Sequence, residues 1–94
     1  MKQVTLHYTG QLASLIGASE ESVALDESFT LLQLVRALSE KHGPSCRELL
    51  LSREGGISPT LLVILDDEQA EGDLESLTFA GVESIMLMTP ISGG

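Results

Sequence analysis

The sequence is poor in cysteine and in positive charge. Cys46 is the only cysteine of the 94 residues, so no internal disulfide can form, and a lone cysteine without a histidine constellation is more often a packed thiol than a nucleophile. Five basic residues stand against 14 acidic ones, which gives a net charge of −9. Because such a surface repels phosphates, we expect no nucleic-acid partner.

Long apolar runs and metal-ligand spacings are also missing. No stretch is long enough to span a bilayer, and Met1-Lys2 leads directly into an alternating pattern instead of a signal-peptide core. We therefore expect a cytoplasmic protein that does not engage a membrane. His7 has no second histidine or cysteine at ligand spacing, and Asp66-Asp67-Glu68 lacks calcium-loop spacing, so the sequence predicts neither a metal site nor a cofactor.

What is present fits one small folded domain. With 43% hydrophobic and 20% charged residues, the chain can bury a single modest core. It is too short for a self-contained multi-site enzyme, and no convincing pair of nucleophile and base stands out. We expect a domain that works with partner proteins.

The first half of the chain predicts a hairpin followed by a helix. Val4, Leu6 and Tyr8 alternate with polar residues, and 22–25 reads as a second short strand that pairs with the first. Between them, residues 12–16 have helical spacing and end at Gly17.

A capping box predicts the start of the main helix, because Thr30 can cap the N-terminus while Gln33 reaches back. Four apolar residues form the predicted buried stripe, namely Leu31, Leu34, Val35 and Leu38. The predicted polar side carries Gln33, Arg36, Ser39 and Glu40. Gly43 and Pro44 end the helix.

The second half adds a short helix near 45–51, a turn-rich loop at 52–56 and two strands. Residues 61–65 form a continuous apolar run, which favours a strand buried on both faces well inside the sheet. In the last strand, 84–89, two arrangements fit the alternation: Ile85 and Leu87 face the core while Met86 and Met88 face outward, or the converse.

The chain ends in Thr89-Pro90-Ile91-Ser92-Gly93-Gly94. Pro90 cannot donate to a strand ladder, and Gly93 and Gly94 can thread a channel too narrow for other residues. The sequence therefore predicts a folded domain over 1–88 and a flexible tail over 89–94.

This ending after an apolar strand resembles the C-terminus of ubiquitin-like sulfur carriers, the family that includes the small subunit of molybdopterin synthase and the thiamin-pathway carrier. The resemblance implies an α+β, ubiquitin-like β-grasp fold, with a mixed sheet, one main helix packed across it and a central last strand parallel to the first. It also implies a non-catalytic carrier. The resemblance further implies that an ATP-dependent activating enzyme adenylates the carboxylate of Gly94, which then becomes a thiocarboxylate that donates sulfur.

By the same resemblance, Pro90, Ile91, Ser92 and Gly93 thread into the partner's site, and the partners are the activating enzyme and the large subunit of molybdopterin synthase or another acceptor. Outward-facing Met86 and Met88 are the predicted partner-binding residues. Three alternatives remain: a protein modifier conjugated through Gly94, a carrier for thiamin, cysteine or tRNA thiolation, and a binding module with an inert tail.

Overall fold

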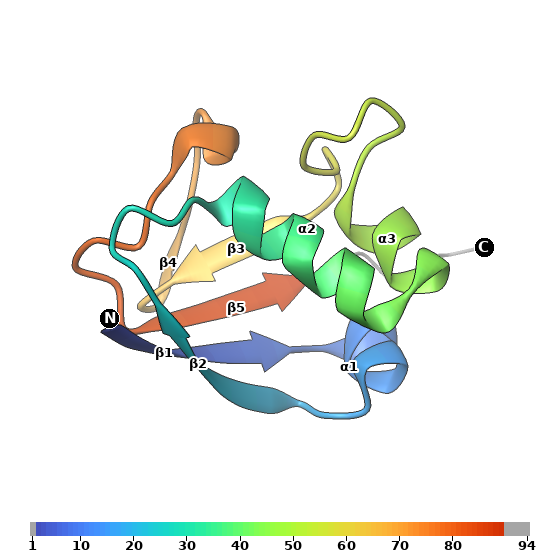
Figure 1. The fold of residues 1–94 in the computed structure, drawn as a ribbon, viewed down its shortest axis with the longest axis horizontal. Coiled ribbons are helices and arrows are strands. Elements are labelled where there is room, and N and C mark those ends of the chain that lie inside the picture. The colour runs from blue at the N-terminus through green and yellow to red at the C-terminus, as the bar shows by residue number, and fades with distance from the viewer. Residues whose placement is uncertain (1, 90–94) are drawn as a thin grey trace.

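The chain builds a mixed sheet with helices on one side (Figure 1). This computed structural model describes residues 2–89. In order, the elements are β1 (Lys2–Tyr8), α1 (Gly10–Ile16), β2 (Glu20–Leu25), α2 (Leu31–His42), α3 (Pro44–Leu50), β3 (Leu62–Leu65), β4 (Glu68–Gln69), the 3₁₀ helix η1 (Leu74–Ser76) and β5 (Ser84–Met88). None of the helices within residues 2–89 has both the length and the apolar character needed to cross a bilayer.

The last strand is central in the sheet, whose order is β2-β1-β5-β3-β4. β5 runs parallel to β1, with Leu6 beside Ile85, and antiparallel to β3, with Val63 beside Leu87. β1 and β2 pair as the predicted antiparallel hairpin. The predicted arrangement, a central last strand parallel to the first, is confirmed.

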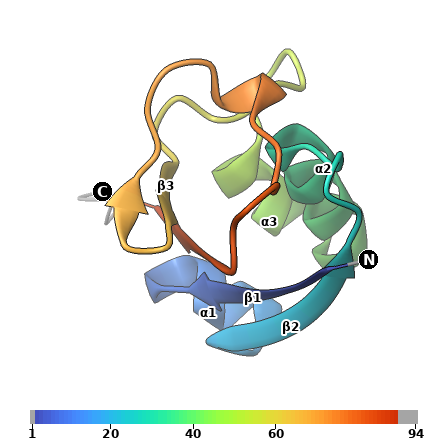
Figure 2. The same cartoon turned by 90° about the vertical axis from the view of Figure 1, so that its left-hand side faces the viewer.

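α2 and α3 pack against one face of this sheet (Figures 1 and 2). The capping box predicted at the start of α2 is present, since Thr30 Oγ1 accepts from Gln33 N at 3.1 Å and Thr30 N donates to Gln33 Oε1 at 2.8 Å. All four residues of the predicted apolar stripe are buried. Ser39 is also buried, which the sequence did not predict. Its burial is tolerated because its hydroxyl donates to the carbonyl of Val35 at 2.9 Å.

β3 differs from the prediction of a strand buried on both faces. Val63 is buried, but Leu62 is 43% exposed and Ile64 is only half-buried. The cause is the layer arrangement, because α2 and α3 cover one face of the sheet and leave alternate β3 side chains on the other. The apolar run therefore reflects a sheet face that is apolar and partly exposed.

A two-residue turn joins β3 to β4. Asp66 and Asp67 both have positive φ, 45° and 73°, and Leu65 pairs with Glu68 across them. This is the type I′ geometry that matches the twist of a hairpin. Aspartate tolerates the left-handed region better than most residues, which explains why the turn forms without glycine.

The loop after α3 is held in place at both ends. Leu51 forms a β-bridge with Ile57, and Glu75 Oε2 accepts from the backbone N of Ile57 at 3.1 Å. At the tip, Arg36 of α2 donates from Nε and Nη2 to the carbonyl of Gly55, at 3.2 and 2.9 Å. The sequence predicted a plain turn here, and the arginine that anchors it is 19 residues away.

Candidate functional site

The candidate site begins where β5 ends, at Met88. Leu87 pairs with Tyr8 in the parallel β1, and α1 begins at Gly10, two residues after Tyr8. The end of β5 therefore lies beside the start of α1, at the C-terminal ends of the parallel strands β1 and β5 (Figure 1). The predicted tail residues, Pro90, Ile91, Ser92, Gly93 and Gly94, lie outside the described residues, so their roles stay predictions.

The strand that leads to the tail is firmly anchored. Ile85 and Leu87 are fully buried, with no exposed surface, while Met86 and Met88 are half-buried on the opposite face. Of the two arrangements that the sequence left open, the structure has Ile85 and Leu87 in the core. Because β5 is paired on both sides, a tail that follows it starts from a fixed point.

Four apolar side chains lie together on the uncovered face. Cross-strand partners share a face of a sheet, and here Leu62 pairs with Met88 and Ile64 with Met86. We call Leu62, Ile64, Met86 and Met88 the outer patch. The outer patch includes Met88, the last residue of β5.

The same face is polar over β1 and β2. His7 pairs with Met86 in the sheet register, and its Nδ1 lies 3.5 Å from Glu20 Oε1. His7 thus faces outward, as predicted, with an acid as its neighbour. Among residues 2–89, no group of three histidine, cysteine or acidic side chains is placed to hold a metal ion.

The start of β5 is fixed by Asp66. Its Oδ1 accepts from the backbone N of Ser84 at 2.9 Å and of Glu83 at 3.1 Å. These bonds, that of Ser84 first, hold the pKa of the Asp66 carboxyl below its usual range. The sequence gives the turn but not this role, since the donors lie 17 and 18 residues further along the chain.

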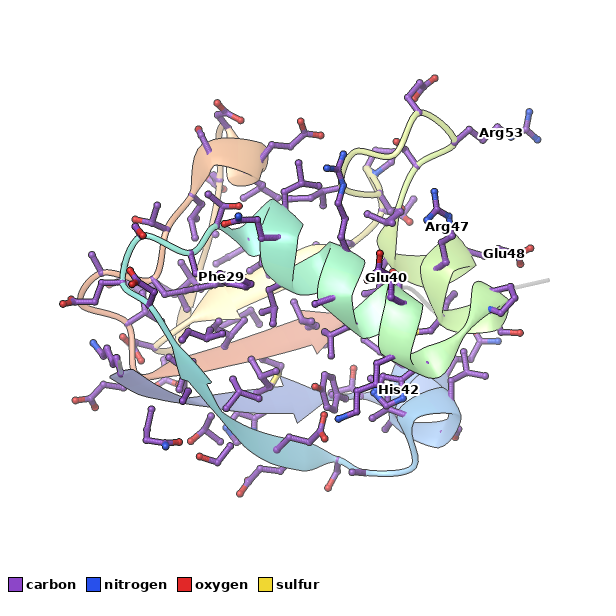
Figure 3. The ribbon with its side chains drawn as sticks, viewed as in Figure 1. Phe29, Glu40, His42, Arg47, Glu48 and Arg53 are labelled. Carbon is purple, nitrogen blue, oxygen red and sulfur yellow. The ribbon has the colours of Figure 1, made fainter. Side chains whose placement is uncertain are left out.

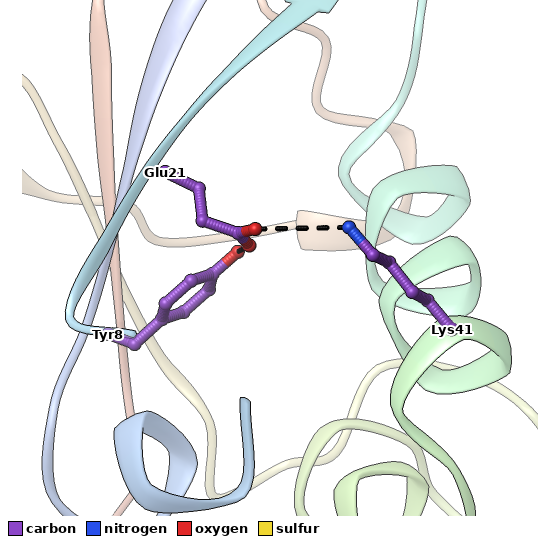
Figure 4. A network of polar contacts seen from close by, with 3 residues as sticks. All are labelled: Tyr8, Glu21 and Lys41. Atoms are coloured by element: carbon purple, nitrogen blue, oxygen red, sulfur yellow. Dashed lines mark hydrogen bonds and ion pairs between the residues drawn. The ribbon is translucent and has the colours of Figure 1, made fainter. Parts of the chain in front are cut away.

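A buried tyrosine at the C-terminal end of β1 contacts β2 and, through Glu21, α2 (Figure 4). Tyr8 Oη donates to Glu21 Oε1 at 2.7 Å, and Glu21 Oε2 lies 3.8 Å from Lys41 Nζ at the end of α2. Burial first, and then the bond to Glu21, raises the pKa of Tyr8 far above its usual value. The phenol therefore stays protonated and joins β1 to β2 beside the end of β5.

Comparisons with known proteins support one fold assignment. No protein-family model matches the sequence, and no curated protein matches it either. SAMP1 from Haloferax volcanii has a similar structure, with a TM-score of 0.73, 25% sequence identity, and coverage of 98% of this chain and 99% of that one. The chain has the ubiquitin-like β-grasp fold.

Two further β-grasp neighbours have lower identity. A protein from Pyrococcus furiosus, assigned as molybdopterin converting factor, subunit 1, gives a TM-score of 0.64 at 16% identity, with 97% of this chain and 100% of that chain covered. Urm1 from Sulfolobus solfataricus gives 0.55 at 12% identity, with 92% and 99% covered. Together with SAMP1, these neighbours confirm the predicted ubiquitin-like β-grasp fold.

The one cysteine of this β-grasp domain lies in the core. Cys46 has no exposed surface, and burial raises the pKa of its thiol. A protonated, enclosed thiol is a poor nucleophile, which confirms its interpretation as a packing residue.

His42 lies at the end of α2 (Figure 3), and its Nε2 is buried with no hydrogen-bond partner among residues 2–89.

Proposed function

We propose that the chain is a sulfur carrier whose reactive group is the carboxylate of Gly94. The observation that supports this most directly is the Gly93-Gly94 ending placed after the central strand of a β-grasp domain. A carboxylate without bulky neighbours suits a narrow active site, and the anchored β5 gives a partner a fixed body to recognise. The chain is then the substrate of the activation step.

The proposed chemistry is supplied by the partners. An activating enzyme joins the Gly94 carboxylate to AMP from ATP, with release of pyrophosphate. A persulfide sulfur then attacks the acyl carbon and expels AMP, and reduction by a thiol leaves the thiocarboxylate. Acid and base groups for these steps come from the partner, because the only cysteine of the carrier is enclosed and protonated.

For the destination of the sulfur we propose molybdopterin synthesis in the cytoplasm, with this chain as the small subunit beside a large catalytic subunit. The structural similarity to molybdopterin converting factor, subunit 1, over 97% of this chain supports this choice. The outer patch is the proposed contact surface for both the activating enzyme and the large subunit.

A second candidate function is conjugation to other proteins through Gly94. The neighbour with 25% identity, and others of the same kind, are called small archaeal modifier proteins. Both functions need an activated Gly94, and they differ in what the activated carbonyl meets next. A lysine amine gives a stable amide adduct, whereas a sulfur donor gives a free thiocarboxylate.

Intact mass spectrometry after co-expression with the activating enzyme tests both. For a carrier, we expect the mass gain of one oxygen replaced by sulfur. Adducts on lysines of other proteins would instead favour the modifier function. Deletion of Gly94, or addition of one residue after it, should abolish either product and leave the circular dichroism spectrum unchanged. Activation of the extended chain without trimming would contradict the terminal-carboxylate mechanism.

A further inference from the structure

Two of the basic side chains of this acidic chain lie together. Only five side chains are basic, three of them arginines, and Arg47 and Arg53 line the same surface pocket, with Glu48, the buried Leu51 and Ser52. Figure 3 shows Arg47 on α3 and Arg53 on the following loop, both at the end of the molecule away from the N-terminus. Two cations face one pocket in a chain with a net charge of −9.

Neither arginine is used inside the described structure. The ion pairs within residues 2–89 are His7–Glu20 and Lys41–Glu21, and the arginine that makes a side-chain hydrogen bond there is Arg36. Both Arg47 and Arg53 are exposed. Arg53 is nonetheless presented on an ordered loop, because Arg36 and the Leu51–Ile57 bridge fix that loop against α2 and α3.

A second groove lies on the other side of α3. It has a volume of about 470 Å³ and lies between α1 and α3, where Leu15 and Leu49 are its apolar lining residues beside the polar Gln11, Ser14, Ser45 and Glu48. Leu15 is 43% exposed, one of two large apolar side chains that are so exposed within residues 2–89. Glu48 lines both hollows, so they form one continuous surface across α3.

This surface adjoins the end of β5. α1 begins beside Met88, as the pairing of Tyr8 with Leu87 requires. α3 is connected to the same place through the loop before β3, because Ser58 N donates to the carbonyl of Leu50, Leu61 N donates to the carbonyl of Ser58, and Leu62 pairs with Met88. Any protein that takes the C-terminal tail must approach this end of the molecule.

We propose that the α3 surface, formed by the Arg47–Arg53 pocket and the Leu15–Leu49 groove, docks an acidic segment of the activating enzyme that carries a large apolar side chain. The inference rests on the proposed function. Carboxylates of the segment pair with the two arginines, and its apolar side chain enters the groove.

The surface has a distinct role from the outer patch. The outer patch lies on the uncovered face of the sheet, whereas the α3 surface lies over helices on the other side of the end of β5. Contact at both places would hold the carrier at two points around the origin of the tail. Charge contacts at the rim of an interface mainly change association and its salt dependence, so they set how readily the carrier is captured.

The test is the kinetics of Gly94 adenylation by the activating enzyme, measured at two salt concentrations. Arg47→Gln with Arg53→Gln should raise the apparent KM of the carrier about tenfold, leave kcat unchanged and reduce the salt dependence of KM. Leu15→Ser should raise KM severalfold by removing the apolar contact. The matched control is Lys2→Gln, which removes one positive charge elsewhere and should leave KM nearly unchanged, compared with Arg47→Gln and Arg53→Gln made singly.

The outcomes separate the two proposals. A carrier that is adenylated normally, with the same KM in the arginine variant, overturns the inference alone. An equal rise of KM in the arginine and lysine variants also overturns it, because net charge then accounts for the effect. If the unmodified chain is not adenylated at all, the proposed function fails, and the inference fails with it. Denaturation midpoints of all variants exclude loss of folding as the cause.

Discussion

At the scale of single residues, two polar side chains hold the sheet around β5. Asp66 binds the backbone where β5 begins, and Tyr8 binds Glu21 where β1 ends beside it. Their chemistry differs, because Asp66 is exposed and acts as an anion, whereas Tyr8 is enclosed and stays neutral. The sequence identifies Asp66 only as a turn residue and Tyr8 only as a strand residue. It does not predict their hydrogen bonds, since their partners are distant in the chain.

The role of Asp66 gives a prediction with a defined pH dependence. Asp66→Asn keeps a residue that tolerates positive φ but removes the charge that strengthens the bonds from Ser84 and Glu83. The pKa of Asp66 is lower in the folded chain than in the unfolded one. Its stabilising effect is therefore complete above a pH of about 4 and is lost as the pH falls through the folded-state pKa. Asp66→Asn should lower the denaturation midpoint at neutral pH.

Asp67→Asn is the matched control for this measurement. Asp67 is in the same turn with φ of 73°, and its side chain makes no hydrogen bond within residues 2–89. The control should leave the midpoint nearly unchanged at every pH. If the difference between the unmodified chain and Asp66→Asn were as large at pH 3 as at pH 7, an anionic role for Asp66 would be wrong.

At the scale of elements, the sequence predicted best where the signal is local. The capping box, the apolar stripe of α2 and the alternation in β1 each depend on residues within a few positions of one another, and all three are confirmed. β3 was less well predicted, because an apolar run has the same appearance whether one face of the strand is covered or two. The burial of Ser39 and the anchoring of the 52–56 loop by Arg36 depend on packing between elements, which no local pattern records.

α2 provides the prediction at this scale. Leu34→Ala should lower the free energy of unfolding by about 2–5 kcal/mol, because Leu34 is buried between helix and sheet and its removal leaves a cavity. Leu38→Ala should act similarly. Arg36→Ala, on the exposed side of the same helix, removes only hydrogen bonds to Gly55 and should cost about 1 kcal/mol. Urea denaturation measures all three, and an unchanged midpoint for Leu34→Ala would show that the buried face of α2 is misassigned.

At the scale of the whole molecule, the structural core is separate from the two surfaces that we propose as partner contacts. The apolar side chains of the core lie between the sheet and α2 and α3, while the outer patch and the α3 surface lie on different sides of the end of β5. The C-terminal motif, on which the proposed function depends, is a prediction from the sequence alone. The two surfaces around it could not be predicted as units, because each gathers residues from elements that are distant in the chain.

The outer patch carries the last prediction. Met88→Asp places a charge on the uncovered face at the end of β5, where the proposed partners bury apolar surface. Because Met88 is half-buried at the end of β5 and contributes little to the core, stability should fall much less than in Leu34→Ala. Activation should weaken through a higher apparent KM for the carrier. Met86→Asp should weaken activation in the same way, with a larger loss of stability, since Met86 lies between β1 and β3 within the sheet.

The control for the outer patch is Ala24→Asp, which adds the same charge to the same face at an exposed position on β2. It should leave KM unchanged, because β2 lies two strands away from the patch. Adenylation kinetics and urea denaturation on the three variants separate the possible causes. A stable Met88→Asp variant that is activated as well as the unmodified chain would remove the outer patch from partner binding. A loss of stability as large as that of Leu34→Ala would instead assign Met88 to the core.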